Sequence, residues 1–224
     1  MHLHVFEAPH QNRSNANVVS PLTDNLDTWD KELMHDEDKE FLIDGIKNGF
    51  KIIKTQDSPN KVICRNYKSA TQEHFEDTEK QIIKELELCR YVICDKQPLI
   101  VSSIGAIPKK SGGVRLIHDC SRPSGYSVNS YADKQSFKYT TVDKAVELLP
   151  NDGWMAKIDL SSAYRSVPLH PSNVPYMGLQ WTFSGDVKPT YFTDTRLPFG
   201  GTECPEKFQR ITNAVCRMML RRGY

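Results

Sequence analysis

One aspartate stands where a carboxylate could bind a metal ion. Asp159 follows the mostly apolar residues 155–158, near the end of a strand predicted over 154–160. A strand holds such a side chain precisely, and phosphoryl transfer needs Mg²⁺ ions held by one or two carboxylates and a backbone carbonyl. The alternative is an aspartate that only forms a turn or caps a helix, which is the commoner role after a strand. Asp159 is therefore a candidate metal ligand that needs support from the surrounding sequence.

Basic residues cluster in two parts of a chain that is nearly neutral as a whole. Lysine and arginine number 29 and aspartate and glutamate 28, for a net charge of +1. The first cluster, within 105–138, consists of Lys109, Lys110, Arg115, Arg122, Lys134 and Lys138 against Asp119 and Asp133, and the second consists of Lys207, Arg210, Arg217, Arg221 and Arg222. Both are candidate phosphate-contacting surfaces, with ordinary solvated faces as the alternative.

The segment 24–44 is acidic and is not expected to touch nucleic acid. It carries nine carboxylates against two lysines.

The six cysteines form no C-x-x-C pair and have no histidine at zinc spacing, so neither a zinc site nor a disulfide framework is predicted. No apolar run approaches membrane-spanning length and the first residues lack a signal-peptide pattern. We therefore expect an intracellular protein, in the cytoplasm or nucleus, without membrane contact.

The elements that must position these residues mix helices and strands. Residues 1–28 are polar and aperiodic, which predicts an extended or disordered lead-in, and 29–98 form a helical N-terminal region. Helices are predicted over 29–50, 72–92 (with Val92 on its apolar stripe), 142–149 (capped by Thr141) and 205–222 (with Phe208, Ile211, Val215, Met218 and Met219 inward). Strands are predicted over 99–101, 104–108, 114–118, 154–160, 176–183 and 190–197, with turns at 111–113 and 184–186. Because they do not alternate as βαβ units, the fold class is α+β.

Three motifs, in the right order, resemble those of reverse transcriptases. Segment 157–164 (KIDLSSAY) resembles the first palm motif, segment 107–119 (IPKKSGGVRLIHD) the fingers hairpin, and Leu197-Pro198-Phe199-Gly200-Gly201, with Pro205 and Phe208, the second palm motif. Phrases over 115–123, 127–129 and 163–168 are most similar to those of DIRS-type retrotransposons. The resemblance implies a right-hand polymerase in which 99–224 are the fingers and the N-terminal, incomplete part of the palm, preceded by the helical N-terminal region.

The resemblance also implies roles for individual residues. Asp159 is the first metal-binding carboxylate and the catalytic residue, and the Leu160 carbonyl contacts the same Mg²⁺; the intact enzyme uses two such ions, which Mn²⁺ could replace. The implied nucleotide-binding residues are Lys109 (or Lys110, if the turn length shifts the match), Arg115, Tyr164, Phe199 and Gly200, with Tyr164 excluding a 2′-hydroxyl. Asp119 and Arg122 face the template strand. The implied partners are deoxynucleoside triphosphates and an RNA or DNA template-primer duplex. For Tyr164, core packing is the alternative.

The adjacent aspartate pair of the family's next motif does not occur in these 224 residues. Asp186 and Asp194 are not replacements, because one lies in a polar turn and the other in a strand, and both are expected to be solvated. Glu203-Cys204 also departs from the small residues common there. We therefore expect these residues alone to be inactive, as part of an RNA-directed DNA polymerase. The alternatives are a non-catalytic retrotransposon relic that binds nucleic acid or protein, and an interaction protein whose acidic segment is the working part. The sequence beyond Tyr224 would separate the polymerase from the non-catalytic relic, because an in-frame aspartate pair favours the polymerase.

Overall fold

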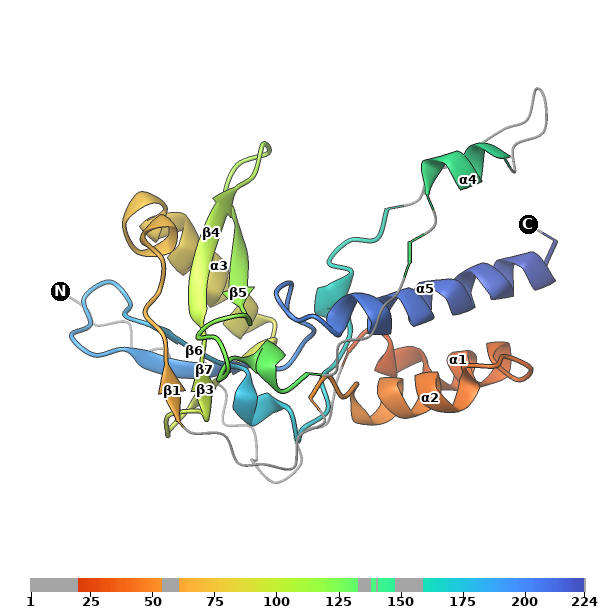
Figure 1. Cartoon of the computed structure of the whole chain (residues 1–224), viewed down its shortest axis with the longest axis horizontal. Coiled ribbons are helices and arrows are strands. Elements are labelled where there is room, and N and C mark those ends of the chain that lie inside the picture. Colours follow the sequence, from red (N-terminus) through yellow and green to blue (C-terminus); the bar gives the residue numbers. More distant parts are fainter. Residues whose placement is uncertain (1–19, 54–60, 133–137, 140, 148–158, 224) are drawn as a thin grey trace.

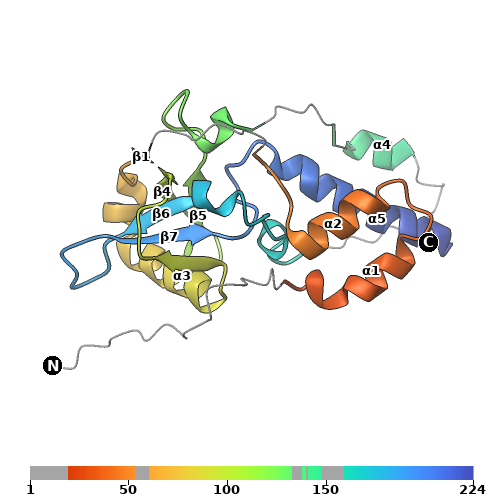
Figure 2. The same ribbon diagram turned by 90° about the horizontal axis from the view of Figure 1, so that it is seen from below.

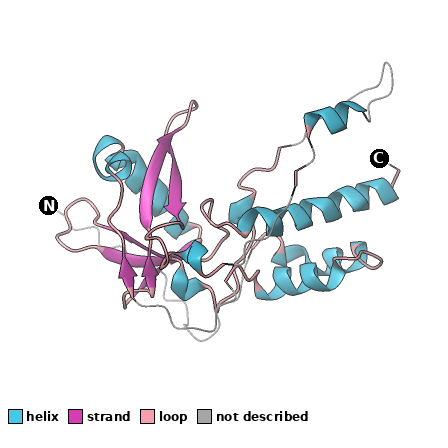
Figure 3. Cartoon of the chain, viewed as in Figure 1, coloured by secondary structure: helices cyan, strands magenta, loops and turns pink. Residues whose placement is uncertain are grey.

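The computed structural model describes residues 20–53, 61–132, 138–139, 141–147 and 159–223. Its α-helices are α1 (Leu26–Glu32), α2 (Lys39–Asn48), α3 (Phe75–Glu87), α4 (Val142–Glu147) and α5 (Cys204–Arg221). Its strands are β1 (Val62–Ile63), β2 (Tyr91–Cys94), β3 (Ile100–Val101), β4 (Ser103–Pro108), β5 (Val114–Asp119), β6 (Gly178–Trp181) and β7 (Thr190–Asp194). Short turns of helix are η1 (Thr23–Asn25), η2 (Ser69–Glu73), η3 (Val128–Ser130), η4 (Tyr164–Ser166) and η5 (Val174–Tyr176). Figures 1 and 3 show the strands and α3 at one end of the molecule and α1, α2 and α5 at the other.

The strands form one mixed sheet and one separate hairpin. The sheet has the order β1-β3-β6-β7-β2, with β3 parallel to β1 and β6, and β7 antiparallel to β6 and β2. Strands β4 and β5 pair only with each other, in a register that places Ile107 opposite Arg115. The predicted α+β class, the hairpin with its glycine turn and the β6–β7 pair are therefore confirmed. Most of the strand predicted over 154–160 lies outside the described residues.

The first predicted helix is two helices. η1 and α1 begin inside the stretch expected to be irregular, and the chain turns between Glu32 and Lys39. The Asp36 side chain accepts a hydrogen bond from the Asp38 backbone amide at 3.0 Å, and this local bond competes with a continued helix. α1 and α2 lie beside α5 when the molecule is seen from below (Figure 2).

The second predicted helix is shorter than its apolar pattern. α3 ends at Glu87, shortly before Cys89 adopts a left-handed backbone with φ of 52°. Val92 lies in β2, with 48% of its surface exposed, so its assignment to the helical stripe was wrong. Thr141 does cap α4, because its hydroxyl accepts the Lys144 amide at 3.3 Å.

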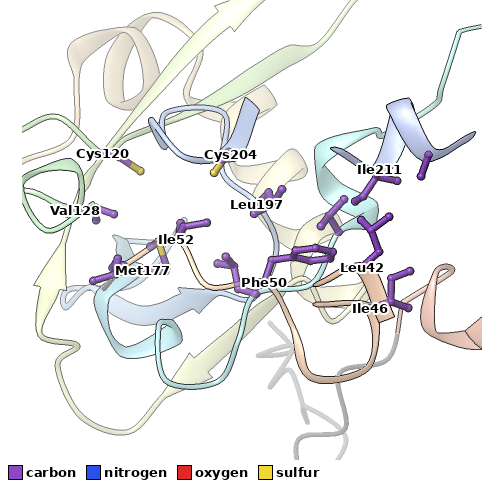
Figure 4. Close-up of a cluster of buried hydrophobic side chains, with 14 of the residues drawn as sticks. Leu42, Ile46, Phe50, Ile52, Cys120, Val128, Met177, Leu197, Cys204 and Ile211 are labelled. Carbon is purple, nitrogen blue, oxygen red and sulfur yellow. The ribbon is translucent and has the colours of Figure 1, made fainter. Parts of the chain in front are cut away.

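Two hydrophobic clusters hold these elements together. The larger one joins Leu42 and Ile46 of α2 and Ile211 of α5 to Phe50 and Leu197, as Figure 4 shows. The smaller one packs Ile82 of α3 against both the hairpin and the sheet. Along α5, Ile211 and Ala214 are buried, whereas Val215 and Met219 are 38% and 40% exposed. Successive helical residues differ by about 100° in direction, so burying Ala214 turns Val215 away. The predicted inward positions of Val215 and Met219 were therefore wrong.

The acidic segment pairs with the second basic cluster. Arg217 contacts Asp36 at 2.6 Å and Asp38 at 3.2 Å, and Arg210 also pairs with Asp38. Arg221 lies 3.6 Å from Asp36, Arg222 pairs with Glu32, and the Arg210 guanidinium lies over the Phe41 ring. These arginines are therefore engaged by carboxylates of the same chain, and their contact with phosphates stays a prediction. We call the contacts of Asp36 and Asp38 with Arg210 and Arg217 the α2–α5 clamp.

We predict that the α2–α5 clamp makes stability depend on pH in the acidic range. The hydrogen bond from Arg217 is the largest influence on Asp36 and lowers its pKa to about 2. Because the folded-state pKa lies below that of the unfolded chain, this stabilisation is present above about pH 4 and is lost as pH falls toward 2. Asp36→Asn should reduce the free energy of unfolding near pH 7 by roughly 1 kcal/mol, since Arg217 is partly exposed and screened, and should flatten the loss between pH 4 and 2 in urea titrations.

Glu37→Gln is the matched control, because Glu37 also contacts Arg217 but its side chain is 80% exposed. Its unfolding curves should follow those of the wild type. Equal stability and equal acid sensitivity of Asp36→Asn and the wild type would contradict a stabilising clamp.

Candidate nucleotide site

A cavity of about 280 Å³ lies between α3, the hairpin and the segment after β7. Lys109 and Arg115 line it from the hairpin, and Ser162 and Phe199 line it from the two segments that resemble palm motifs. Lys110 is exposed at the hairpin tip and is not among the lining residues. The structure thus brings Lys109, Arg115 and Phe199 together and places Lys109, of the two candidate lysines, in the cavity wall.

Three aromatic rings connect the two motif-like segments. The Tyr164 ring stacks on Phe199, with centroids 5.3 Å apart and an interplanar angle of 24°, and it also packs on Phe208 at 5.2 Å. The Arg115 guanidinium lies 5.9 Å from the Phe199 centroid, at the edge of the range of cation–π contact. Burial raises the pKa of the Tyr164 hydroxyl. Tyr164 therefore packs against the core, as in the alternative given from the sequence, and it meets the cavity only through Phe199, since it is not itself among the lining residues; its role in excluding a 2′-hydroxyl stays a prediction.

Gly200 lies against the backbone of the hairpin. A Cβ atom at this position would overlap the carbonyl oxygen of His118 and lie 3.1 Å from the Cys120 amide nitrogen. The Asn129 side chain fastens the same loop, since it donates to the Gly200 carbonyl at 2.9 Å and accepts from the Thr202 amide at 2.9 Å. The close approach expected of Gly200 is thus made to protein backbone.

The two predicted template residues lie together at the end of β5. Asp119 accepts hydrogen bonds from the Tyr67 hydroxyl and from the Ser121 amide. The Arg122 side chain is 72% exposed, and its Nε lies 4.0 Å from Asp119. The bond to Asp119 raises the pKa of Tyr67. Asp119 is therefore held by protein partners, whereas Arg122 is available to an external group.

Asp159 and Leu160 are exposed and lie in irregular chain before η4. The residues that would form the preceding strand, 154–158, lie outside the described part. Within the described residues no group of three or more histidine, cysteine, aspartate or glutamate side chains is placed to hold a metal ion. The roles of Asp159 and of the Leu160 carbonyl as metal ligands therefore stay predictions.

A buried ionic cluster forms the floor of the cavity, and we call it the Arg165 cluster. Arg165 donates to both oxygens of Asp194, at 2.7 and 2.9 Å, and to Glu85 at 2.8 and 3.1 Å. The exposed fractions are 9% for Arg165, 1% for Asp194 and 6% for Glu85. The expectation that Asp194 is solvated was therefore wrong, because the two carboxylates and the guanidinium compensate one another away from water. Asp186, by contrast, is exposed in its turn as expected.

The cluster perturbs the titration of its members in opposite directions. Burial, the largest single influence, raises the pKa of Asp194, but Arg165 and His118 together outweigh burial and the pKa lies below its usual value. Burial, the largest single influence, lowers the pKa of Arg165, and Asp194, Tyr91 and Glu85 together more than reverse this. His118, which is also buried, has its Nδ1 3.7 Å from Asp194. Both charges of the Arg165–Asp194 pair therefore persist across the physiological range.

Sequence reasoning missed Glu85, Asn129 and the role of Arg165. Glu85 lies on the buried side of a helix whose sequence shows only an amphipathic stripe, and its partner is 80 positions away. Arg165 and Asn129 lie within segments that resemble those of DIRS-type retrotransposons, but no local sequence pattern indicates their partners. The only sequence feature that indicated the burial of Glu85 is that this charged residue interrupts an apolar stripe.

No protein-family model and no curated protein matched the chain. Among solved structures, the crystal structure of prototype foamy virus protease-reverse transcriptase resembles it, with a TM-score of 0.51 and 17% sequence identity. The match covers 72% of this chain and 20% of that one, so the chain corresponds to about a fifth of that protein. The chain has a reverse-transcriptase-like fold. Within the described residues, no helix combines the length and the apolar character needed to cross a membrane.

We predict that Gly200→Ala separates the second motif-like loop from the hairpin. The new methyl group would meet backbone atoms, which cannot rotate away as a side chain can. The free energy of unfolding should fall by about 1 to 3 kcal/mol, as for other overpacked sites, and chemical denaturation measures it. Gly105→Ala is the control on the same hairpin, because the nearest atom to its Cβ would be a Tyr67 ring carbon at 3.3 Å. An equal loss in both variants would contradict the specific contact at Gly200.

Proposed function

We propose that this chain supplies the fingers hairpin and the first part of the palm of an RNA-directed DNA polymerase, of the kind carried by DIRS-type retrotransposons. Its substrates would be a deoxynucleoside triphosphate and a primer paired to an RNA or DNA template. The reverse-transcriptase-like fold and the three ordered motifs support this proposal. The foamy virus protein is named as a reverse transcriptase, and the same activity is proposed for the protein to which this chain belongs.

The observation that carries the proposal is the shared cavity. Lys109 and Arg115 lie on one wall, and Phe199, stacked on Tyr164, lies on another. Two cations can bind and neutralise a triphosphate, which is the main requirement of phosphoryl transfer, and an aromatic surface can contact a sugar or base. A nucleotide placed between these walls would have its phosphates toward the hairpin and its sugar toward Tyr164.

Asp159 and the Leu160 carbonyl would hold one Mg²⁺ ion that is shared with substrate phosphates. Mg²⁺ keeps several waters and is commonly bound by one or two carboxylates together with phosphate oxygens, which matches Asp159 and the Leu160 carbonyl. When bound, the ion would neutralise developing charge on the phosphates. A two-ion site requires more carboxylates than Asp159, because two cations about 4 Å apart repel. The residues of this chain therefore bind and orient the nucleotide in the proposed function.

We predict that Lys109→Ala and Arg115→Ala each weaken deoxynucleoside triphosphate binding about tenfold or more, since a hydrogen bond to a charged group contributes roughly 1.5 to 3 kcal/mol. Isothermal titration of the 224-residue protein with dATP and Mg²⁺ measures the change. Lys188→Ala is the matched control, because Lys188 is exposed in the β6–β7 turn, away from the cavity lining. Equal affinities of wild type, Arg115→Ala and Lys188→Ala would count against the assignment of the cavity to the nucleotide.

We further predict that Asp159→Asn affects nucleotide binding only when Mg²⁺ is present. With Mg²⁺ the variant should bind dATP several-fold more weakly, because a carboxylate ligand is lost. In EDTA it should bind equally well or better, because a negative charge near the triphosphate is removed. Asp186→Asn, in an exposed turn, is the control and should match the wild type under both conditions. The same loss with and without Mg²⁺ would refute a metal-binding role for Asp159.

A further inference from the structure

The Arg165 cluster joins three segments that are distant in sequence. Arg165 lies in η4 directly after Tyr164, Asp194 ends β7 shortly before Phe199, and Glu85 lies on α3. The guanidinium also reaches the Leu197 carbonyl at 3.4 Å and lies over the Tyr91 ring at 5.4 Å. The Arg165 side chain therefore connects its own segment, which carries Tyr164, to the segment that carries Phe199.

Backbone hydrogen bonds transmit this anchoring to Tyr164 and Phe199. The Ser166 amide donates to the Ser162 carbonyl at 3.0 Å, and the Val167 amide donates to Tyr164 at 3.1 Å. The Leu197 amide donates to Val167 at 3.1 Å, so the two segments are also paired with each other. Ser162 has φ of 54°, an uncommon conformation for a residue with a side chain, which needs support from its surroundings.

Because the Arg165 cluster is buried, small displacements of its members are strongly unfavourable. A guanidinium has a planar set of donors, and here its donors are shared between two carboxylates. A shift of η4 relative to β7 would leave a buried charge without its partner, which is far costlier than the loss of an exposed ion pair. Gln81 and Arg90 complete the shell by contacting the second oxygen of Glu85 at 3.1 and 3.6 Å. The cluster thus defines one relative position of the two segments.

We infer that Arg165 is a positioning residue that fixes the stacked Tyr164 and Phe199 rings relative to the cavity, and so sets the discrimination between deoxy- and ribonucleotides. The second half of this inference rests on the proposed function. The reason is geometric, because a ring that excludes a hydroxyl group must be held to within a fraction of an ångström. Arg165 acts through these rings and through the backbone, at the base of the site.

A neutral triple variant, Glu85→Gln, Arg165→Met and Asp194→Asn, tests this inference. It removes Arg165 together with both of its carboxylate partners, so that neither Asp194 nor Glu85 is left as a buried charge facing a missing guanidinium, and it keeps the approximate side-chain shapes. The matched control removes one arginine and two carboxylates from the α2–α5 clamp, as Asp36→Asn, Asp38→Asn and Arg217→Met. Both variants, the wild type and Tyr164→Ala are compared as the 224-residue protein.

The first measurement is amide hydrogen exchange at Ser166, Val167 and Leu197, which needs no ligand. Exchange should be about tenfold faster or more in the neutral triple variant, through local opening of the anchored segments, and unchanged in the clamp control. The second measurement is the ratio of affinities for dATP and ATP with Mg²⁺. This ratio should fall toward one in the neutral triple variant, as in Tyr164→Ala, and should stay at the wild-type value in the clamp control.

The outcomes separate the inference from the proposed function. Unchanged exchange in the neutral triple variant would overturn the anchoring, whatever the nucleotide results. Faster exchange with an unchanged affinity ratio would reduce Arg165 to a structural residue and overturn the positioning role. Faster exchange in a protein whose wild type binds no nucleotide would refute the proposed function and still uphold the anchoring of the two segments by Arg165.

Discussion

A guanidinium held between two carboxylates, away from water, is the constraint on which the site depends. Arg165 cannot be moved or neutralised without leaving Asp194 or Glu85 as a buried charge, and the cost of such a charge exceeds that of most single contacts. A hydrophobic contact in the same place would tolerate small displacements, because dispersion attraction is non-directional. The directional bonds of Arg165 therefore give a precise position to η4 and to the segment after β7, which the surrounding apolar residues alone would specify less sharply.

The N-terminal helices use charge differently. Asp36 and Asp38, in the turn between α1 and α2, meet the arginines of α5, and because the Arg217 side chain is 29% exposed, solvent screens each pair and the contribution per pair is small. The larger hydrophobic cluster, which includes Leu42, Ile46 and Ile211, supplies the affinity between α2 and α5. The charges then favour one register of α2 along α5, because a displaced register would bring carboxylates away from arginines. The acidic segment thus has a clear role inside the chain, which weakens the alternative in which it is the working part of an interaction protein.

The sequence predicted those parts of the fold whose signals are local. The hairpin was predicted from alternating apolar residues around a glycine turn, and α5 was predicted from its helical period. The structure confirms both elements. The break after α1 was missed because it depends on the Asp36 side chain bonding to a nearby amide, which competes with a plausible helical period. The burial of Asp194 was missed for a different reason. Nothing near it in sequence shows that Arg165 and Glu85 approach it, so a polar residue in a short strand was assigned to the surface.

Some residues of the candidate site could be predicted from local motifs, whereas their arrangement in space could not. This arrangement bears on how the proposed nucleotide would bind. Lys109, Arg115 and Phe199 were predicted from motifs, and the fold brings them to one cavity. Asp159, in contrast, is exposed, and a single carboxylate attracts a cation weakly in water, where two unit charges 4 Å apart gain only about 1 kcal/mol. Under the proposed function, Asp159 alone would hold little Mg²⁺ until triphosphate oxygens complete the ligand set. The hairpin cations need no such partner, because they attract the triphosphate directly. Nucleotide binding by Lys109 and Arg115 should therefore precede and strengthen metal binding at Asp159, with the Arg165 cluster keeping the Tyr164–Phe199 stack in place throughout.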